Sequence, residues 1–142
     1  MSRDAKQAPV KVRRIAFVLS SLKFGGGERV ALNLAHALKA AGYQIDFLLM
    51  SKEGEFLAEA QHHFNVHDLD CGRTWKLPGR LVRYLYMNRP VALVSSFWKL
   101  NLCACLARMV YPRVKLLLWE HSPPSKSKNS PTWLYSISAS LF

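Results

Sequence analysis

The apolar positions of this 142-residue chain form short continuous runs, separated by longer segments in which apolar residues recur at helical spacing. The runs are rich in β-branched and aliphatic residues, a pattern typical of strands that are covered on both faces of a sheet. They predict strands over residues 14–20, 43–50, 65–69, 91–95 and 114–119.

The segments between the runs predict helices. In the first of them, apolar residues recur at intervals of three and four, and Gly42 stands at the favoured position just after a helix end. That apolar face consists of Val30, Leu34, Ala37, Leu38 and Ala41. Pro78 suits a first helical turn, and Pro90 disfavours helix in the residue before it. Helices are therefore predicted over residues 28–41, 53–63, 79–88, 100–111 and 131–142.

Strands that alternate with helices in this way predict the α/β class. The expected architecture is a Rossmann-like parallel sheet with helices on both faces and right-handed crossovers. In such sheets ligands bind beyond the carboxyl ends of the strands. We expect a polar leader over residues 1–11 and one domain over residues 12–142. The apolar face of the last helix runs to Phe142 without a polar cap, so we expect the domain to be incomplete.

Composition excludes several classes of protein. Half of the residues are hydrophobic and a fifth are charged, which is typical of a globular domain. The three cysteines form no CxxC pair and no zinc-ligand spacing, so a reducing compartment is expected. No apolar stretch reaches the ~20 residues of a membrane-spanning helix. Residues 15–22 follow a basic stretch, but no cleavage site follows them, so a signal peptide is not expected.

The positive charge is concentrated in the second half of the chain. The net charge is +11, and the second half carries eleven Lys and Arg against a single acidic residue, Glu120. We expect this half to face an anionic partner such as phosphate groups, nucleic acid or acidic lipid.

The first candidate site is the glycine-rich segment SSLKFGGGER over residues 20–29. Glycines let the backbone approach a ligand closely, and the free amides of Glu28 and the turn after it suit a phosphate oxygen. The alternative is a flexible turn. A Walker A loop is excluded because no Gly-Lys-Ser/Thr follows. A dinucleotide site is disfavoured because Val30 replaces a glycine and Met50 replaces an acid.

The second candidate is Glu120 and His121, which directly follow a predicted strand. A neutral imidazole there could bind a substrate hydroxyl or transfer a proton near neutral pH. The alternative is a loop histidine with an ordinary hydrogen-bond partner. Lys126 and Lys128 add a basic loop nearby, where a diphosphate could bind. The other histidines are expected at the surface, and no metal site is expected.

The third candidate is the segment over residues 73–89, in which five Lys and Arg alternate with aromatic and aliphatic side chains. Such a segment could lie on an anionic membrane surface, where each basic residue contributes about 1 kcal/mol. The alternative is an ordinary crossover helix with a solvated basic side.

Four features in order resemble the N-terminal half of a GT-B glycosyltransferase, specifically a retaining enzyme of family 4. The first is the opening strand, GGxE loop, helix and second strand over residues 14–50. The others are the passage NRPVALVSS, the helix over residues 101–107 and the strand that ends in Glu-His, LLLWEHSPPS. The passage has Pro90-Val91 where that family usually has Pro-Asp. The resemblance covers residues 14–125.

The resemblance implies a hexosyltransferase-type enzyme that moves a sugar from a nucleotide-sugar donor to a lipid-linked or polysaccharide acceptor. It implies no cofactor and no metal, and a cytoplasmic location that could be peripheral on the inner face of the membrane. Gly25, Gly26, Gly27 and Glu28 would form the substrate-binding loop, and His121 would contact the transferred sugar.

Within the same resemblance, Glu120 is a second catalytic candidate, and Asn101 and Lys126 are further binding candidates. The C-terminal donor domain of the family has no counterpart here, so the chain alone is expected to have little or no activity.

Two other functions remain open. One is a non-catalytic basic module on a Rossmann-like fold that binds an anionic membrane or nucleic acid; for the enzyme itself, no nucleic acid partner is expected. The other, a nicotinamide-dependent reductase, is disfavoured by Val30 and Met50.

Overall fold

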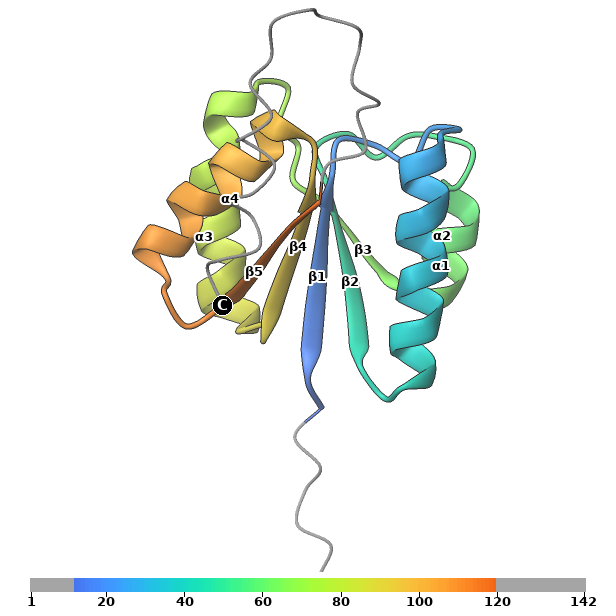
Figure 1. Cartoon of the computed structure of the whole chain (residues 1–142). Coiled ribbons are helices and arrows are strands. Elements are labelled where there is room, and N and C mark those ends of the chain that lie inside the picture. Colours follow the sequence, from blue (N-terminus) through green and yellow to red (C-terminus); the bar gives the residue numbers. More distant parts are fainter. Residues whose placement is uncertain (1–11, 120–142) are drawn as a thin grey trace, which may run out of the picture.

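The computed structural model describes residues 12–119, which fold into a five-stranded parallel sheet flanked by helices (Figure 1). The strand order is β3-β2-β1-β4-β5. The strands are β1 (Arg14–Leu19), β2 (Gln44–Leu49), β3 (Asn65–Asp68), β4 (Ala92–Ser96) and β5 (Lys115–Trp119). The predicted α/β class and parallel sheet are confirmed, and every predicted strand up to residue 119 is present.

Four α-helices connect the strands, and a short 3-10 helix, η1 (Thr74–Lys76), precedes the third of them. The pair α1 and α2 lies on one side of the sheet and the pair α3 and α4 on the other (Figure 1). Their bounds are α1 (Gly26–Ala40), α2 (Leu57–His63), α3 (Leu77–Asn88) and α4 (Trp98–Val110). The helix predicted over residues 131–142 lies outside the described residues.

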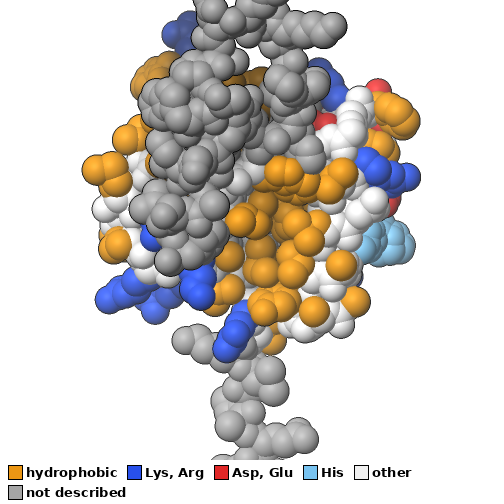
Figure 2. Space-filling model, viewed as in Figure 1, with side chains coloured by type: hydrophobic (Ala, Val, Ile, Leu, Met, Phe, Trp, Pro, Cys, Tyr) orange, Lys and Arg blue, Asp and Glu red, His pale blue; other side chains and the backbone are white. Residues whose placement is uncertain are grey.

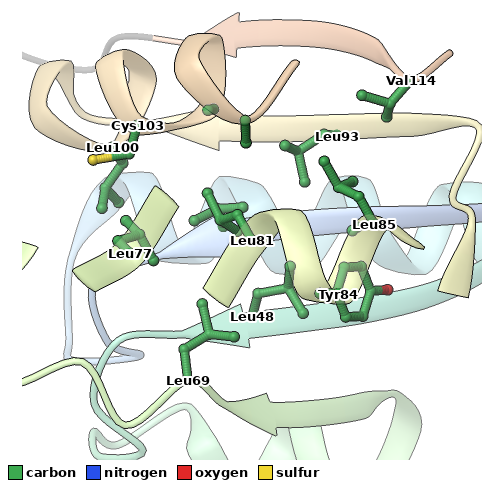
Figure 3. Packing of buried hydrophobic residues seen from close by; sticks show 14 of the residues in the cluster. Leu48, Leu69, Leu77, Leu81, Tyr84, Leu85, Leu93, Leu100, Cys103 and Val114 are labelled. Atoms are coloured by element: carbon green, nitrogen blue, oxygen red, sulfur yellow. The ribbon is translucent and has the colours of Figure 1, made fainter. Parts of the chain in front are cut away.

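Each side of the sheet has its own apolar core. On the α1 side, Phe17 of β1 stacks on Phe47 of β2, with ring centroids 5.3 Å apart. On the α3 side, Val18 and Leu48 pack with leucines of α3 and with Leu93 of β4 (Figure 3). Because successive residues of β1 enter alternate cores, this central strand is apolar throughout, which explains its continuous hydrophobic run.

Two details of the first helix differ from the prediction. Helix α1 begins at Gly26 rather than at residue 28, because periodicity detects only residues that carry side chains. Its buried residues are Ala31, Leu32 and Ala35, whereas Val30 is 41% exposed. Leu34 and Leu38 of the predicted face do pack against the core, but the centre of the buried face is shifted toward the small residues Ala31 and Ala35, where the helix can lie close to the sheet.

Helix α2 is shorter than predicted and begins at Leu57. The residues that precede it form a loop instead, because their backbone groups pair with the segment that leads into α1.

The outer surface of α4 and strand β5 is apolar but exposed. Trp98, Leu102 and Met109 of α4 are 57%, 58% and 80% exposed, although they follow a helical stripe. Leu117 and Leu118 of β5 are 43% and 37% exposed. A helix that is apolar on two sides is expected to contact more than one partner. Within residues 12–119 only one of these sides of α4 is covered, by the sheet and α3.

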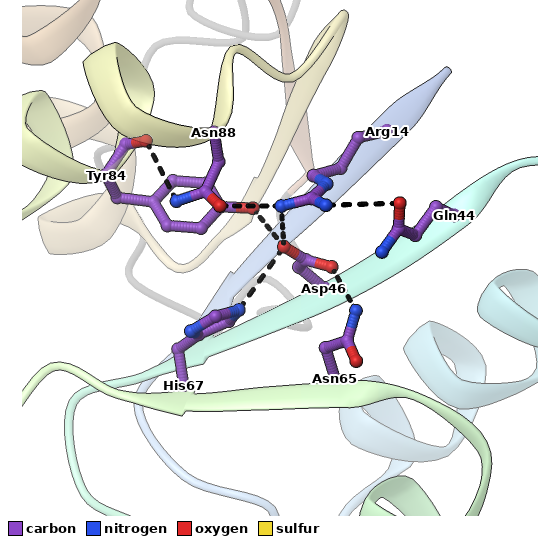
Figure 4. Close-up of polar contacts among 7 residues, drawn as sticks. All are labelled: Arg14, Gln44, Asp46, Asn65, His67, Tyr84 and Asn88. Atoms are coloured by element: carbon purple, nitrogen blue, oxygen red, sulfur yellow. Dashed lines mark hydrogen bonds and ion pairs between the residues drawn. The ribbon is translucent and has the colours of Figure 1, made fainter. Parts of the chain in front are cut away.

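A buried carboxylate joins the sheet to α3. Asp46 of β2 is fully buried and points to the α3 side of the sheet (Figure 4). Its Oδ2 accepts a hydrogen bond of 2.5 Å from the Tyr84 hydroxyl, and its Oδ1 accepts one of 3.0 Å from Asn65 Nδ2. Arg14 Nη1 forms an ion pair with Oδ2 at 3.3 Å, and His67 Nε2 lies 3.3 Å from the same oxygen.

The arginine of this cluster is itself held in place by two amides. Arg14 donates from Nη1 to Asn88 Oδ1 at 2.6 Å and from Nη2 to Gln44 Oε1 at 3.1 Å. Burial and the neighbouring Asp46 carboxylate raise the pKa of Tyr84, so its hydroxyl remains a donor at neutral pH. The charge of Asp46 is therefore compensated inside the fold, as a buried charge requires.

Replacing Tyr84 with Phe should lower the free energy of unfolding by about 1–3 kcal/mol, because one oxygen of the buried Asp46 carboxylate loses its hydrogen-bond donor. Urea denaturation measures this change. Tyr86→Phe is the matched control, because the Tyr86 hydroxyl donates only an exposed 3.4 Å bond to the Val110 carbonyl. Equal losses for the two variants would contradict the assigned role of Tyr84.

Candidate functional site

The segments predicted to hold the site follow three strands at the carboxyl edge of the sheet. Strands β1, β4 and β5 end at Leu19, Ser96 and Trp119, and β4 lies between the other two. Since neighbouring strands are about 4.8 Å apart, the tips of β1 and β5 lie roughly 10 Å from each other. A molecule the size of a sugar phosphate could contact both.

The glycine segment forms the N-terminus of α1. Gly25 is the residue before the helix, in an extended conformation, and the first helical hydrogen bond runs from the Arg29 N–H to the Gly25 carbonyl at 3.1 Å. The N–H groups of Gly26, Gly27 and Glu28 therefore have no partner within the helix. A Cβ on Gly26 would meet nothing within 4 Å. These amides are open to an approaching ligand.

The Glu28 side chain turns back toward the start of the same helix. A Cβ on Gly25 would collide with its carboxylate, so the glycine leaves the space that Glu28 occupies. A carboxylate in the first turn is stabilised by the positive end of the helix dipole. The loop thus combines free amide donors with one acceptor group.

The loop between β1 and α1 is held by the loop between β2 and α2. The Leu22 N–H donates to the Glu53 carbonyl at 2.9 Å, and the Phe56 N–H donates to the Leu22 carbonyl at 3.0 Å. The Phe24 N–H donates to Glu55 Oε2 at 2.7 Å. These bonds make the glycine segment part of a fixed platform rather than the flexible turn considered as its alternative.

Side chains strengthen the same platform. Arg29 of α1 lies over the Phe56 ring, 4.9 Å from its centroid, and pairs with Glu59 of α2 at 3.0 Å. Lys23 pairs with Glu53 at 3.0 Å, and this hydrogen bond and charge lower the pKa of the Glu53 carboxyl group. The exposed ion pairs add little stability individually, so the backbone bonds carry most of the restraint.

A cleft of about 640 Å³ opens beside the platform, at the ends of β1, β2 and β3. Its walls come from residues 20–21, 23, 50–53, 68 and 70–72, and they carry both lysines and acidic side chains. Cys71 also lines the cleft, but burial raises the pKa of its thiol, so it is not a nucleophile at neutral pH. The mixed charges suit a polar, hydroxyl-bearing molecule.

The segment that runs from β4 into α4 contains buried polar atoms without a hydrogen-bond partner among the described residues. Ser95 is fully buried, and neither its hydroxyl oxygen nor Asn101 Oδ1 has a hydrogen-bond partner in the part of the chain that the structure describes. Phe97, between them, has a φ of +91° and is 52% exposed. Positive φ is costly for a bulky residue and often marks a functional position.

Sequence reasoning identified Asn101 but missed Ser95 and Phe97. A serine inside an apolar strand was a usable signal for Ser95, whereas nothing in the sequence indicates the backbone conformation of Phe97. Glu120, His121 and Lys126 lie outside the described residues, so their roles stay predictions.

Comparison with known proteins identifies the family. The profile of glycosyltransferase family 4 matches residues 24–141, most of the chain. The chain belongs to glycosyltransferase family 4. The expected family is thereby confirmed. No curated protein is similar enough in sequence to count as a match.

Solved glycosyltransferase structures share the fold of this family 4 chain. A glycosyltransferase from Rickettsia africae matches with a TM-score of 0.67 and 14% identity over 92% of this chain and 34% of its own. MurG from Acinetobacter baumannii matches with a TM-score of 0.58 and 16% identity over 76% of this chain and 35% of its own.

The lipopolysaccharide outer core galactosyltransferase WaaB, in its apo form, gives a TM-score of 0.58 and 19% identity, over 76% of this chain and 33% of its own. The chain therefore spans about a third of the length of these solved relatives. The expected GT-B type of Rossmann-like fold is confirmed.

Gly54 is the residue of the platform that no other amino acid can replace without strain. Its φ is +123°, and a Cβ there would collide with the backbone of Leu22 and Lys23. Gly54→Ala in the family 4 chain should lower the free energy of unfolding by roughly 1–3 kcal/mol and displace the loop before α1. Thermal or urea denaturation measures the loss.

Gly42→Ala is the matched control, because Gly42 also has a positive φ, +92°, but a Cβ there would meet nothing within 4 Å. The decrease in unfolding free energy for Gly42→Ala therefore reports only the strain of placing a side chain at positive φ. If Gly54→Ala lowers the free energy of unfolding no more than Gly42→Ala does, the close approach of Leu22 does not require a glycine at position 54.

Proposed function

We propose that this chain forms one α/β half of a glycosyltransferase that transfers a sugar from a nucleotide-sugar donor to a glycan or lipid-linked acceptor. The observation that carries the proposal is the open N-terminus of α1 at the carboxyl edge, in a chain whose family is glycosyltransferase family 4. MurG and WaaB share its fold, and WaaB is a galactosyltransferase of the lipopolysaccharide outer core.

The α1 N-terminus suits the hydroxyl groups of a sugar better than a diphosphate. The free amides of Gly26 and Gly27 are hydrogen-bond donors and the Glu28 carboxylate is an acceptor, and a sugar hydroxyl can pair with either kind of group. A diphosphate at the same place would be repelled by Glu28. We therefore assign this loop to the transferred sugar or the acceptor, and expect the diphosphate to lie closer to the basic loop that holds Lys126.

The remaining roles extend the same proposal. The cleft of about 640 Å³ beside the platform would hold the acceptor. His121 and Glu120 would lie near the reacting sugar, two residues or fewer beyond the end of β5. Transfer would retain the anomeric configuration without a metal ion, and basic side chains and helix N-termini would stabilise the leaving diphosphate electrostatically.

The 142-residue chain alone should turn over little or no substrate. It spans about a third of its solved relatives, and a site open to water on one side cannot exclude hydrolysis or align a donor fully. Binding of the donor is therefore a better test than activity.

Titration of the ¹⁵N-labelled chain with UDP- and GDP-sugars should shift the amide signals of Gly26, Gly27 and Glu28. Gly26→Ala should weaken these shifts, because a methyl group enters the open space before the helix, while unfolding free energy stays equal or rises by a few tenths of a kcal/mol. Gly79→Ala, at another position with nothing within 4 Å, is the control. Donor binding that Gly26→Ala leaves unchanged would rule out this loop as the sugar site.

An anionic membrane surface is the second candidate partner, and a specific observation favours it. Residues 71–119 contain nine Lys and Arg and no acidic residue. Helices α3 and α4 pack together. Trp75 and Trp98 on this surface are 71% and 57% exposed, and a lysine lies over each of their rings. Aromatic and basic side chains on one surface suit a lipid interface. Among the described residues, no helix is long and apolar enough to cross a bilayer.

We therefore propose a peripheral location on the inner face of the cell membrane, with contacts that extend from residues 73–89 to the outer surface of α4. Arg80→Gln combined with Arg83→Gln should weaken sedimentation with phosphatidylglycerol vesicles roughly 30-fold, since each exposed basic residue contributes about 1 kcal/mol. Lys39→Gln with Lys52→Gln, in the other half of the chain, is the control of equal charge.

Equal losses for the two double variants would show that only net charge matters. Binding to an oligonucleotide with steep salt dependence, and none to vesicles, would favour the nucleic-acid module instead.

A further inference from the structure

A second cavity opens at the amino edge of the sheet, opposite the proposed transferase site. Its volume is about 1020 Å³, compared with about 640 Å³ for the cleft at the carboxyl edge. Four segments line it: residues 12–15, 43–44 and 88–92, and Lys115. Strands of five or six residues are about 17–20 Å long, so the two cavities are separated by the length of the sheet.

Among the residues that the structure describes, four cationic side chains and no acidic one line the amino-edge cavity. They are Arg13, Arg14, Arg89 and Lys115. Arg14 is already committed to the buried Asp46 carboxylate and to Asn88. The other three are exposed, and none has a side-chain hydrogen bond or an ion pair with another described residue. Three positive charges thus face one cavity without compensation from the described fold.

Backbone contacts hold these three cations near one another. The Arg13 carbonyl accepts the Gln44 N–H at 3.0 Å, and the Lys115 N–H donates to the Val91 carbonyl at 3.0 Å. Arg89 has a left-handed conformation, with a φ of +48°, and its N–H closes α3. Residues 13, 89 and 115 therefore stand at the starts of the adjacent strands β1, β4 and β5, within about two strand spacings.

The sheet also gives the cavity an apolar part. Val12 and Val91 are 59% and 39% exposed on its walls, and Ile15 and Ala92 belong to the strands behind them. Figure 2 shows an apolar patch over the middle of the molecule, with Lys and Arg side chains at its lower end, which is the end where the strands begin in Figure 1.

We propose that the amino-edge cavity binds a multivalent phosphate group, held by Arg13, Arg89 and Lys115. Guanidinium groups match phosphate oxygens in paired hydrogen bonds, and a lysine adds a point charge. Asp46, which lies behind Arg14, does not compete for these cations because donors already surround it. The site is independent of the proposed transferase function, since it shares no residue with the carboxyl edge.

The phosphate could belong to a soluble diphosphate or to a lipid headgroup, because either presents the same chemistry to the cations. The apolar walls would add contacts for a lipid and none for a soluble anion. Inorganic pyrophosphate and vesicles that contain phosphatidic acid are therefore used as two separate probes.

The test compares two triple variants of the full chain that lower the net charge equally. Arg13→Gln, Arg89→Asn and Lys115→Gln remove the three cations, and Asn is chosen at position 89 because it tolerates the left-handed conformation. Lys23→Gln, Lys39→Gln and Lys52→Gln, at exposed positions outside the cavity and outside the proposed membrane surface, form the control. Pyrophosphate at constant ionic strength should raise Tm and shift the amide signals of residues 13–15, 44, 88–89, 91–92 and 115 in the wild type and in the control.

The amino-edge variant should bind pyrophosphate at least tenfold more weakly than the control. If its fold is impaired, the pair Arg13→Gln and Lys115→Gln, at two exposed positions, should still weaken binding several-fold relative to Lys39→Gln and Lys52→Gln. If only the vesicles distinguish the variants, the phosphate is that of a lipid. Equal affinities of the amino-edge and control variants for both probes would overturn the proposal.

Discussion

The fold depends on satisfying one buried charge. The Asp46 carboxylate has no exposed surface, and its compensation requires Arg14 from β1, Asn65 from β3 and Tyr84 from α3 to be in place together. Leaving such a charge unpaired would cost several kcal/mol, so this register is favoured over any that separates Asp46 from its partners. The parallel order of β3, β2 and β1, and the position of α3 over them, follow from the same requirement.

The two edges of the sheet have different physical characters as a result. At the amino edge, polar side chains are engaged with one another, and within residues 12–119 the outermost cations are left without side-chain partners. At the carboxyl edge the backbone is fixed by the contact between Leu22 and the loop around Gly54, whereas the amides of α1 are left without partners. Rigid support for open donors is what a preorganised binding site requires, because no ordering is needed when the ligand arrives.

The sequence was sufficient for the fold class, for the succession of strands and helices along the chain and for the place of the glycine loop between β1 and α1, because hydrophobic periodicity and loop composition act locally. It failed at the start and face of α1, where Gly26 and the small alanines give no periodic signal. The Asp46 cluster was also missed, since its partners lie up to 38 residues away in the chain. Phe97 shows the same limit, because its backbone conformation depends on how β4 meets α4.

The central position of β1 in the sheet delays its complete pairing during translation. Strand β1 pairs with β4, and Ile15 lies opposite Ala92, so its second partner is synthesised long after it. At about 5–20 residues per second, roughly 4–15 s separate the two during translation. Until residue 110 has been made, Ala16, Val18 and Leu48 lack the complete cover that α3 and α4 provide. The nascent chain therefore exposes an apolar surface and an unpaired strand edge, which chaperones can bind, before folding is complete.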